Sequence, residues 1–197
     1  MFESLLPLLL FVLIATFSPG GATTLATASG ANFGWVRSLP LLSGISVGLA
    51  MVAVAAAGGL GSLILAAPSL QLAMKLVGSL YLLWLAWQIA LRGRPGNAAV
   101  SEKPASFLAG IWLLLQNPKA WAMTLSAAAS FASLTQGPAS LALLLGLVFA
   151  VSCMCSLALW CGAGLALSRL LKSERQWRVL NMTLGGLLVA SIAPIWL

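Results

Sequence analysis

The sequence predicts an all-α integral membrane protein with six transmembrane helices, arranged as two inverted three-helix repeats. Three observations lead to this fold class. The 197 residues are 61% hydrophobic and 7% charged, with a mean hydropathy of +1.05, whereas a soluble domain carries roughly a quarter charged residues. Six apolar runs are each long enough for a membrane helix, which needs about 20 residues. Two of these runs, in matching places of the two halves, are interrupted by proline.

The six runs cover, in order, residues of about 5–28, 39–67, 72–91, 107–131, 139–167 and 179–197. Run one contains Ser18-Pro19-Gly20-Gly21 near its middle, and run four contains Asn117-Pro118-Lys119 at a similar depth. Proline removes a backbone donor and clashes with the preceding turn, and glycine relaxes the backbone beside it. The first and fourth helices are therefore predicted to be broken at Pro19 and Pro118.

The chain is predicted to form one transmembrane domain over residues 1–197. A first repeat of about 1–91 and a second of about 107–197 flank a polar linker of about 92–106. Three helices per half is an odd number, so the second half enters the membrane from the opposite side, as in many secondary transporters. Three pairs of segments echo one another: Pro19 and Pro118; Gly59-Leu60-Gly61 and Gly162-Ala163-Gly164; Gly78-Ser79 and Gly185-Gly186.

The basic residues predict the orientation. Eight of the ten follow runs one, three and five: Arg37, Arg92, Arg94, Lys103, Arg169, Lys172, Arg175 and Arg178. The connections after runs two and four carry none when Lys75 is assigned to its helix. Such an excess marks the cytoplasmic side, so the linker is expected there and both termini in the periplasm. Because these charges are separated by apolar runs, they form no phosphate-binding face, and a nucleic-acid partner is excluded.

The acidic residues are Glu3, Glu102 and Glu174, and the chain has neither aspartate nor histidine. Paired-carboxylate catalysis, a Ser-His-Asp triad and most catalytic metal sites need residues that are missing. The sequence therefore predicts neither an enzyme nor a bound cofactor.

Two small-residue groups leave alternatives open. Cys153, Cys155 and Cys161 lie in run five, either as buried packing residues or, with Met154, as a soft-metal site. Residues two apart on a helix point to different sides, which argues against the metal. Gly44 and Gly48 form a G-x-x-x-G face that packs either within the monomer or in a homodimer.

The break in run one has the chemistry of a zwitterion site. The half-helix that starts after Gly20-Gly21 presents free N–H groups and the positive end of its dipole, which suit a carboxylate. Ser18, Thr23 and Thr24 add hydroxyl groups nearby. The carbonyl groups that end the preceding half-helix suit a cation such as an ammonium group.

Lys119 lies about twelve residues into run four, which is roughly 18 Å at helical rise and thus near the bilayer centre. A lysine at that depth is expected to face a cavity, where it pairs with an anionic group or releases its proton. The structural alternative is a tie to carbonyl groups freed at the Pro118 break. Asn117 offers both a donor and an acceptor there.

The chain resembles the LysE/RhtB family of amino-acid exporters over nearly its whole length. The resemblance is carried by Ser18-Pro19-Gly20, by Asn117-Pro118-Lys119-Ala120 and by the Gly-Ser-x-Tyr-Leu stretch from Gly78 to Leu82. It implies efflux of amino acids or related small metabolites across a bacterial inner membrane, driven by the proton motive force. The family usually has proline where Gly21 stands, and many members carry membrane carboxylates that are missing here. Lys119 is then the candidate for proton coupling.

The leading hypothesis is a secondary active exporter of small zwitterions, with protons and the lipid bilayer as its other partners. The predicted substrate site comprises Ser18, Pro19, Gly20, Gly21, Thr23, Thr24, Asn117, Pro118 and Lys119. Two alternatives are a non-transporting membrane partner that assembles through glycine-rich helices and a soft-metal efflux protein that uses the cysteines.

Overall fold

The computed structural model describes residues 2–60, 66–94 and 104–196, in which all regular secondary structure is helical. Four spans in these ranges are long and apolar enough to cross a membrane: α2 (Gly21–Ala57), α4 (Pro68–Ala90), α7 (Pro138–Leu170), and Glu174–Trp196, which contains α8 (Glu174–Ala190) and α9 (Ala193–Trp196). A shorter apolar stretch, Leu5–Phe17, lies in α1 (Phe2–Phe17). The remaining helices are α5 (Phe107–Leu115), α6 (Pro118–Ser130) and the 3-10 turn η1 (Ala132–Leu134). The protein is therefore a multi-pass membrane protein.

The 37 residues of α2 form two arms, because the chain reverses at Gly34. Gly34 has φ 76° and ψ −178°, a backbone conformation that favours glycine. The Ser29 and Ser38 hydroxyl oxygens lie 2.7 Å apart, although nine residues of continuous helix would separate them by roughly 13 Å. Arg37, which the sequence places in the connection after the first run, belongs to the second arm and is therefore helical.

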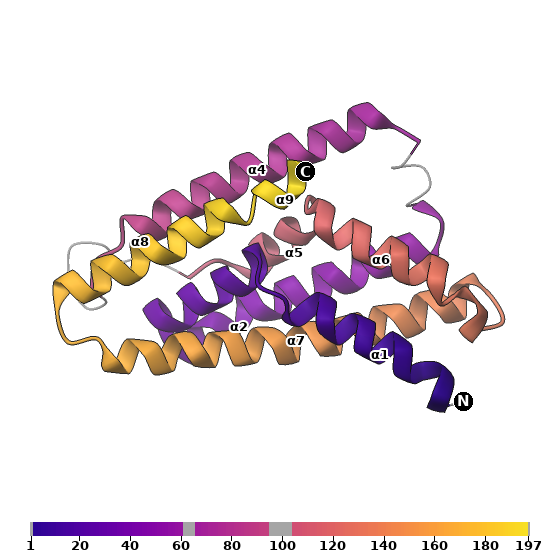
Figure 1. Cartoon of the computed structure of the whole chain (residues 1–197), viewed down its shortest axis with the longest axis horizontal. Coiled ribbons are helices and arrows are strands. Elements are labelled where there is room, and N and C mark those ends of the chain that lie inside the picture. The colour runs from indigo at the N-terminus through magenta and orange to yellow at the C-terminus, as the bar shows by residue number, and fades with distance from the viewer. Residues whose placement is uncertain (1, 61–65, 95–103, 197) are drawn as a thin grey trace.

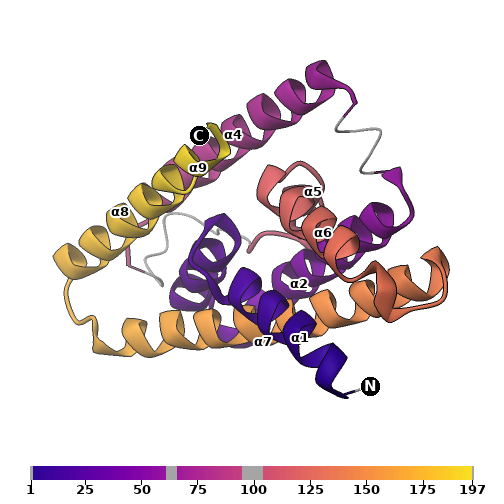
Figure 2. The same cartoon turned by 45° about the vertical axis from the view of Figure 1, so that its right-hand side comes forward.

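Helices α2 and α7 make the most extensive contact in the described structure, and α1 also packs against α7. Helix α4 packs chiefly against α8, and Figures 1 and 2 both show these two helices side by side, on the opposite side of the molecule from α7. The structure thus has two parts: a core of α1, α2, α5, α6 and α7, and an outer pair of α4 and α8.

Glycines allow the core helices to approach backbone to backbone. A methyl group at Gly30 would overlap the Cys161 carbonyl, and one at Gly164 would overlap the Thr27 carbonyl, so the first arm of α2 crosses α7 at close range. Likewise, a methyl group at Gly44 would overlap the Phe107 carbonyl. The Gly44 and Gly48 face packs against α5 within the chain, which leaves no room there for a second copy.

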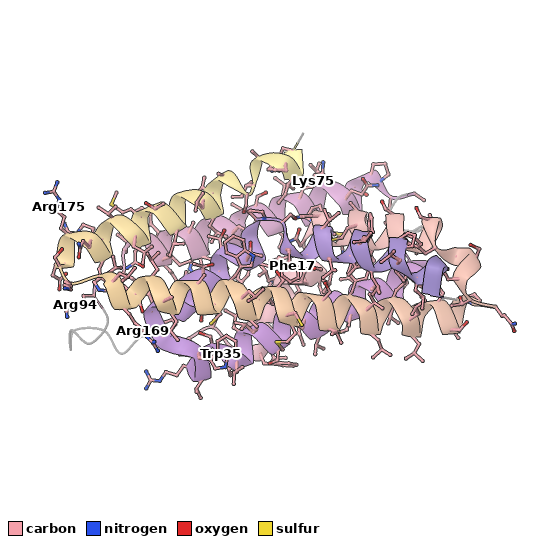
Figure 3. The ribbon with its side chains drawn as sticks, turned by 60° about the horizontal axis from the view of Figure 1, so that its bottom comes forward. Phe17, Trp35, Lys75, Arg94, Arg169 and Arg175 are labelled. Atoms are coloured by element: carbon pink, nitrogen blue, oxygen red, sulfur yellow. The ribbon has the colours of Figure 1, made fainter. Side chains whose placement is uncertain are left out.

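Both predicted helix interruptions are present. Helix α1 ends at Phe17 and α2 begins at Gly21, while α5 ends at Leu115 and α6 begins at Pro118. Phe17, at the end of α1, lies about midway along the molecule (Figure 3). The two breaks therefore occur well inside the helical body rather than at its ends.

Two predicted helix boundaries are wrong. The second arm of α2 ends at Ala57 instead of continuing to residue 67, because Gly59 has φ 91°, which is incompatible with a continuing right-handed helix. Gly59 thus terminates a helix while Gly162 lies inside α7, so these two segments are not structurally equivalent. Gly61 lies outside the described residues.

Helix α8 begins at Glu174, five residues before the predicted start of the sixth run. The Ser173 hydroxyl accepts a hydrogen bond from the Gln176 N–H at 3.3 Å, and the Gln176 side chain accepts one from the Ser173 N–H at 3.0 Å. This capping box places Arg175 and Arg178 in a helix instead of a loop. Residues 95–103, most of the predicted linker, lie outside the described residues.

Candidate functional site

The two helix breaks meet in space. The Lys119 Nζ donates a hydrogen bond to the Ser18 Oγ at 2.8 Å, and a methyl group at Gly20 would lie 3.5 Å from that nitrogen. A cavity of about 50 Å³ lies between the breaks. Six residues singled out from the sequence line it: Ser18, Gly20, Gly21, Thr23, Asn117 and Lys119. We call this space the break cavity.

The first break leaves the start of α2 open. Gly20 is the N-cap residue, in an extended conformation and without a side-chain cap. The Thr23 hydroxyl accepts a hydrogen bond from the Gly20 N–H at 2.8 Å and donates one to the Gly20 carbonyl at 2.9 Å. The next N–H groups of a helix have no acceptor within the helix, so the positive end of α2 points its donors at the break.

The second break is closed by side chains. The Asn117 Oδ1 accepts a hydrogen bond from the Lys119 N–H at 3.0 Å, which caps α6. The Trp121 Nε1 donates to the Leu115 carbonyl at 2.8 Å, so tryptophan, rather than Lys119, satisfies this freed carbonyl group. Lys119 instead reaches across to the other break. Its side chain is exposed, which gives its charge access to the opening beside Ser18.

Three of the predicted site residues lie outside the described lining of the break cavity. Pro19 is exposed and shapes the break without facing the cavity. Thr24 is buried in the first arm of α2 with 9% of its surface exposed. Pro118 lines a separate cavity of about 180 Å³ on the side of α4, together with Lys75 and Trp121.

The polar contacts between α1 and α7 could not be predicted from the sequence. The Thr16 Oγ1 lies 2.7 Å from the Ser152 Oγ, and the Ser156 hydroxyl donates to the Thr16 carbonyl at 2.8 Å. Thr16 and Cys153 both line the break cavity. Ser152 and Ser156 are spaced four residues apart, which is a weak signal for a shared helix face, but their partner is more than 130 residues away.

Gln116, directly before Asn117, was also missed. It is 5% exposed, and neither amide atom of its side chain has a hydrogen-bond partner in the described structure. A buried polar group without a partner costs about 1–3 kcal/mol. Gln116 therefore marks the second break as a place where polar groups lie in the apolar interior.

The three cysteines do not converge. Cys153 is buried at the break cavity, Cys161 is buried at the crossing with Gly30, and Cys155 is exposed on another side of α7. Among the described residues, no group of three His, Cys, Asp or Glu side chains lies close enough to hold a metal ion. The soft-metal hypothesis thus finds no support in their arrangement.

Comparison with known proteins identifies the family. The family model for LysE type translocators matches residues 13–193, a range that includes both helix breaks. The chain belongs to this family. As a LysE type translocator it is a membrane transporter rather than an enzyme, which confirms the resemblance noted from the two proline motifs.

Similar proteins have a described activity. A cysteine/O-acetylserine efflux protein of Klebsiella pneumoniae subsp. pneumoniae is 34% identical over 186 residues, covering 92% of this translocator and 91% of the relative. Proteins of the same description from Salmonella paratyphi A and Escherichia coli O1:K1 / APEC are each 32% identical over 109 residues, or 55% of both chains. No solved structure matches the chain.

Proposed function

We propose that this translocator is a secondary active exporter of small zwitterionic amino acids across the bacterial inner membrane, driven by the proton motive force. The observation that carries the proposal is the meeting of both helix breaks at one cavity, where Lys119 lies beside the open start of α2. A helix N-terminus and a lysine together offer two positive groups to one carboxylate.

Substrate binding must open the break cavity. Its volume of about 50 Å³ holds one or two water molecules, each of which occupies about 30 Å³, and an amino acid is larger. The Lys119–Ser18 hydrogen bond joins the two breaks. When the breaks move apart, this hydrogen bond is lost, and the substrate carboxylate takes the place of the Ser18 hydroxyl as the partner of Lys119. The carbonyl groups at the end of α1 then face the substrate ammonium group.

Lys119 is also the candidate for proton coupling. It is the one side chain in the described lining that carries a charge when protonated, and the lining holds no carboxylate. A lysine that alternates between a hydroxyl partner and a carboxylate partner experiences two different environments, and each favours a different protonation state. Proton release and substrate release then occur at the same group.

The proposed membrane topology has six spans within a single domain. The broken spans are α1 with the first arm of α2, and α5 with α6; the others are the second arm of α2, α4, α7, and α8 with α9. Two inverted repeats with one broken helix each are common in secondary transporters. Arg94, Arg169 and Arg175 gather at one end of the molecule (Figure 3), which supports a cytoplasmic side at that end and periplasmic termini.

The proposed substrates are small zwitterionic amino acids with uncharged side chains, such as cysteine and O-acetylserine. The relatives described above export these two compounds by their description. No acidic or second basic side chain occurs in the described lining of the break cavity, and such a site pairs with the main-chain charges of a substrate rather than with a charged side chain.

An export assay tests the proposal. Cells that overexpress the translocator are loaded with a labelled panel of amino acids, and efflux is compared between the wild type, Lys119→Ala and the control Lys75→Ala. Lys75 also lies in a membrane helix, but its Nζ lies 5.9 Å from the centre of the Trp196 ring, away from the break cavity. We expect Lys119→Ala to abolish efflux and Lys75→Ala to retain it. Normal efflux by Lys119→Ala for every substrate would refute the proposal.

A further inference from the structure

We propose that a second cavity, at the arginine-rich end of the molecule, is a loading site for the carboxylate group of the exported amino acid. This inference rests on the proposed function and adds a separate site to it. The cavity has a volume of about 310 Å³. The residues that matter to the argument are Ser29, Phe33, Tyr81, Trp84, Gln88 and Arg92. We call it the loading cavity.

The two cavities differ in volume: in this conformation one is large enough for a small amino acid and the other is not. The loading cavity, at about 310 Å³, falls at the lower end of the range for small-molecule sites, about 300–1,000 Å³. The break cavity holds only about 50 Å³. This conformation therefore has room for a small amino acid beside Arg92 and none between the helix breaks.

Arg92 is held in position at the loading cavity. The buried Asn181 side chain donates hydrogen bonds to the carbonyl groups of Arg92 at 2.9 Å and Gly93 at 3.3 Å. The Asn181 Oδ1 accepts one from Asn32 on the first arm of α2 at 3.1 Å. The Arg92 guanidinium lies 4.8 Å from the centre of the Phe33 ring. An arginine in this setting presents a planar set of donors that matches a carboxylate.

The rest of the loading cavity suits the other end of a zwitterion. The rings of Tyr81 and Trp84 stack with their centres 5.7 Å apart, and both line the cavity. Aromatic faces attract ammonium groups, and the Gln88 side chain adds an amide oxygen. A site with an arginine at one end and aromatic rings at the other fixes the direction in which an amino acid enters.

The two cavities follow one another along α2. On the first arm, Gly21 lines the break cavity and Leu25 lines the loading cavity; on the second arm, Ile45 and Leu41 do the same. Each pair is separated by four residues, which is about one helical turn, or 6 Å. Arg92 lies beside Phe33, twelve residues beyond Gly21 on the first arm, so a substrate bound at Arg92 moves about 18 Å along the arms to reach the break cavity.

Transport kinetics test the loading site. Inside-out membrane vesicles expose the proposed cytoplasmic end, and uptake of O-acetyl-L-serine gives KM and Vmax. We expect Arg92→Gln to raise KM at least about tenfold, because a charge-assisted hydrogen bond is lost, with Vmax within about twofold of the wild type. Arg92→Lys should retain part of the affinity. The matched control is Arg94→Gln, which removes the same charge two residues away. The Arg94 side chain donates a hydrogen bond to the Lys172 carbonyl and does not belong to the described lining of the loading cavity.

Direct binding separates this inference from the proposed function. Equilibrium binding of labelled L-cysteine, under reducing conditions, is measured on the purified protein in lipid nanodiscs. We expect Arg92→Gln to lose one class of site that Lys119→Ala and Arg94→Gln retain. Equal effects of Arg92→Gln and Arg94→Gln, or no binding lost in Arg92→Gln, would overturn the loading site. Absence of transport in the wild type, with an Arg92-dependent site still present, would refute the exporter proposal and leave the loading site supported.

Discussion

Gly164→Ala tests how closely the first arm of α2 must pack against α7. A methyl group at this position would overlap the Thr27 carbonyl and approach the Ala31 nitrogen to 3.1 Å. Both of these atoms belong to the backbone, so no side-chain rotation relieves the overlap. The two helices must move apart, and the first arm of α2 must shift with its open start at Gly21.

The expected loss of stability follows from two opposing effects. Overpacking costs about 1–3 kcal/mol, and backbone overlap places this site at the upper end of that range. Alanine is favoured over glycine in a helix by up to about 1 kcal/mol. The net destabilisation is therefore about 2 kcal/mol, which corresponds to a decrease in Tm of about 4–8 °C for a chain of this size.

Gly162→Ala is the matched control. Gly162 lies on the same helix, two residues away, and a methyl group there would meet no atom within 4 Å. Only the gain in helix propensity applies, so we expect a Tm equal to or above that of the wild type. Thermal unfolding of both variants in one detergent measures the difference, and export assays on the same variants should show a loss only for Gly164→Ala. Equal Tm values would refute the proposed helix crossing.

Three further variants test the breaks and the contacts beside them. Asn117→Ala should lower stability by about 1 kcal/mol, because α6 loses its N-cap, and thermal unfolding should show Asn117→Ser close to the wild type. Thr16→Val should lower stability by about 1 kcal/mol through the lost Ser152 hydrogen bond; an unchanged Tm would contradict this contact. Gly21→Pro should fold, since proline suits a first helical turn, but it removes an N–H from the proposed carboxylate site. Unaltered transport kinetics in Gly21→Pro would place the substrate elsewhere.

The helix breaks could be predicted from the sequence because their cause is local. Pro118 interrupts a continuous helix because proline has no N–H to donate and clashes with the preceding turn. Pro19, together with Gly20, interrupts the first run for the same reason. Both interruptions lie where the sequence placed them. The open N-cap at Gly20 likewise follows from a residue that has no side chain.

The rest of the site depends on contacts between distant segments. Lys119 reaches Ser18 across 101 residues, and Thr16 reaches Ser152 across 136. Hydrophobic patterning carries no information about such pairs in a chain whose helices are apolar on all sides. The sequence predicts Arg92 only as a loop charge. Its place beside Phe33 depends on the chain reversal at Gly34, a residue that nothing in the pattern of apolar runs distinguishes.

The first arm of α2 is a short helix with a non-helical connection at each end. Residues 18–20 separate it from α1, and the positive φ of Gly34 separates it from the second arm. Between these two connections, this arm packs closely against α7 at the crossing formed by Gly30 and Gly164. Its start borders the break cavity, and Ser29 and Phe33 border the loading cavity. A small rotation of this arm about the crossing would move its two ends in opposite directions, and so would change the shapes of both cavities together.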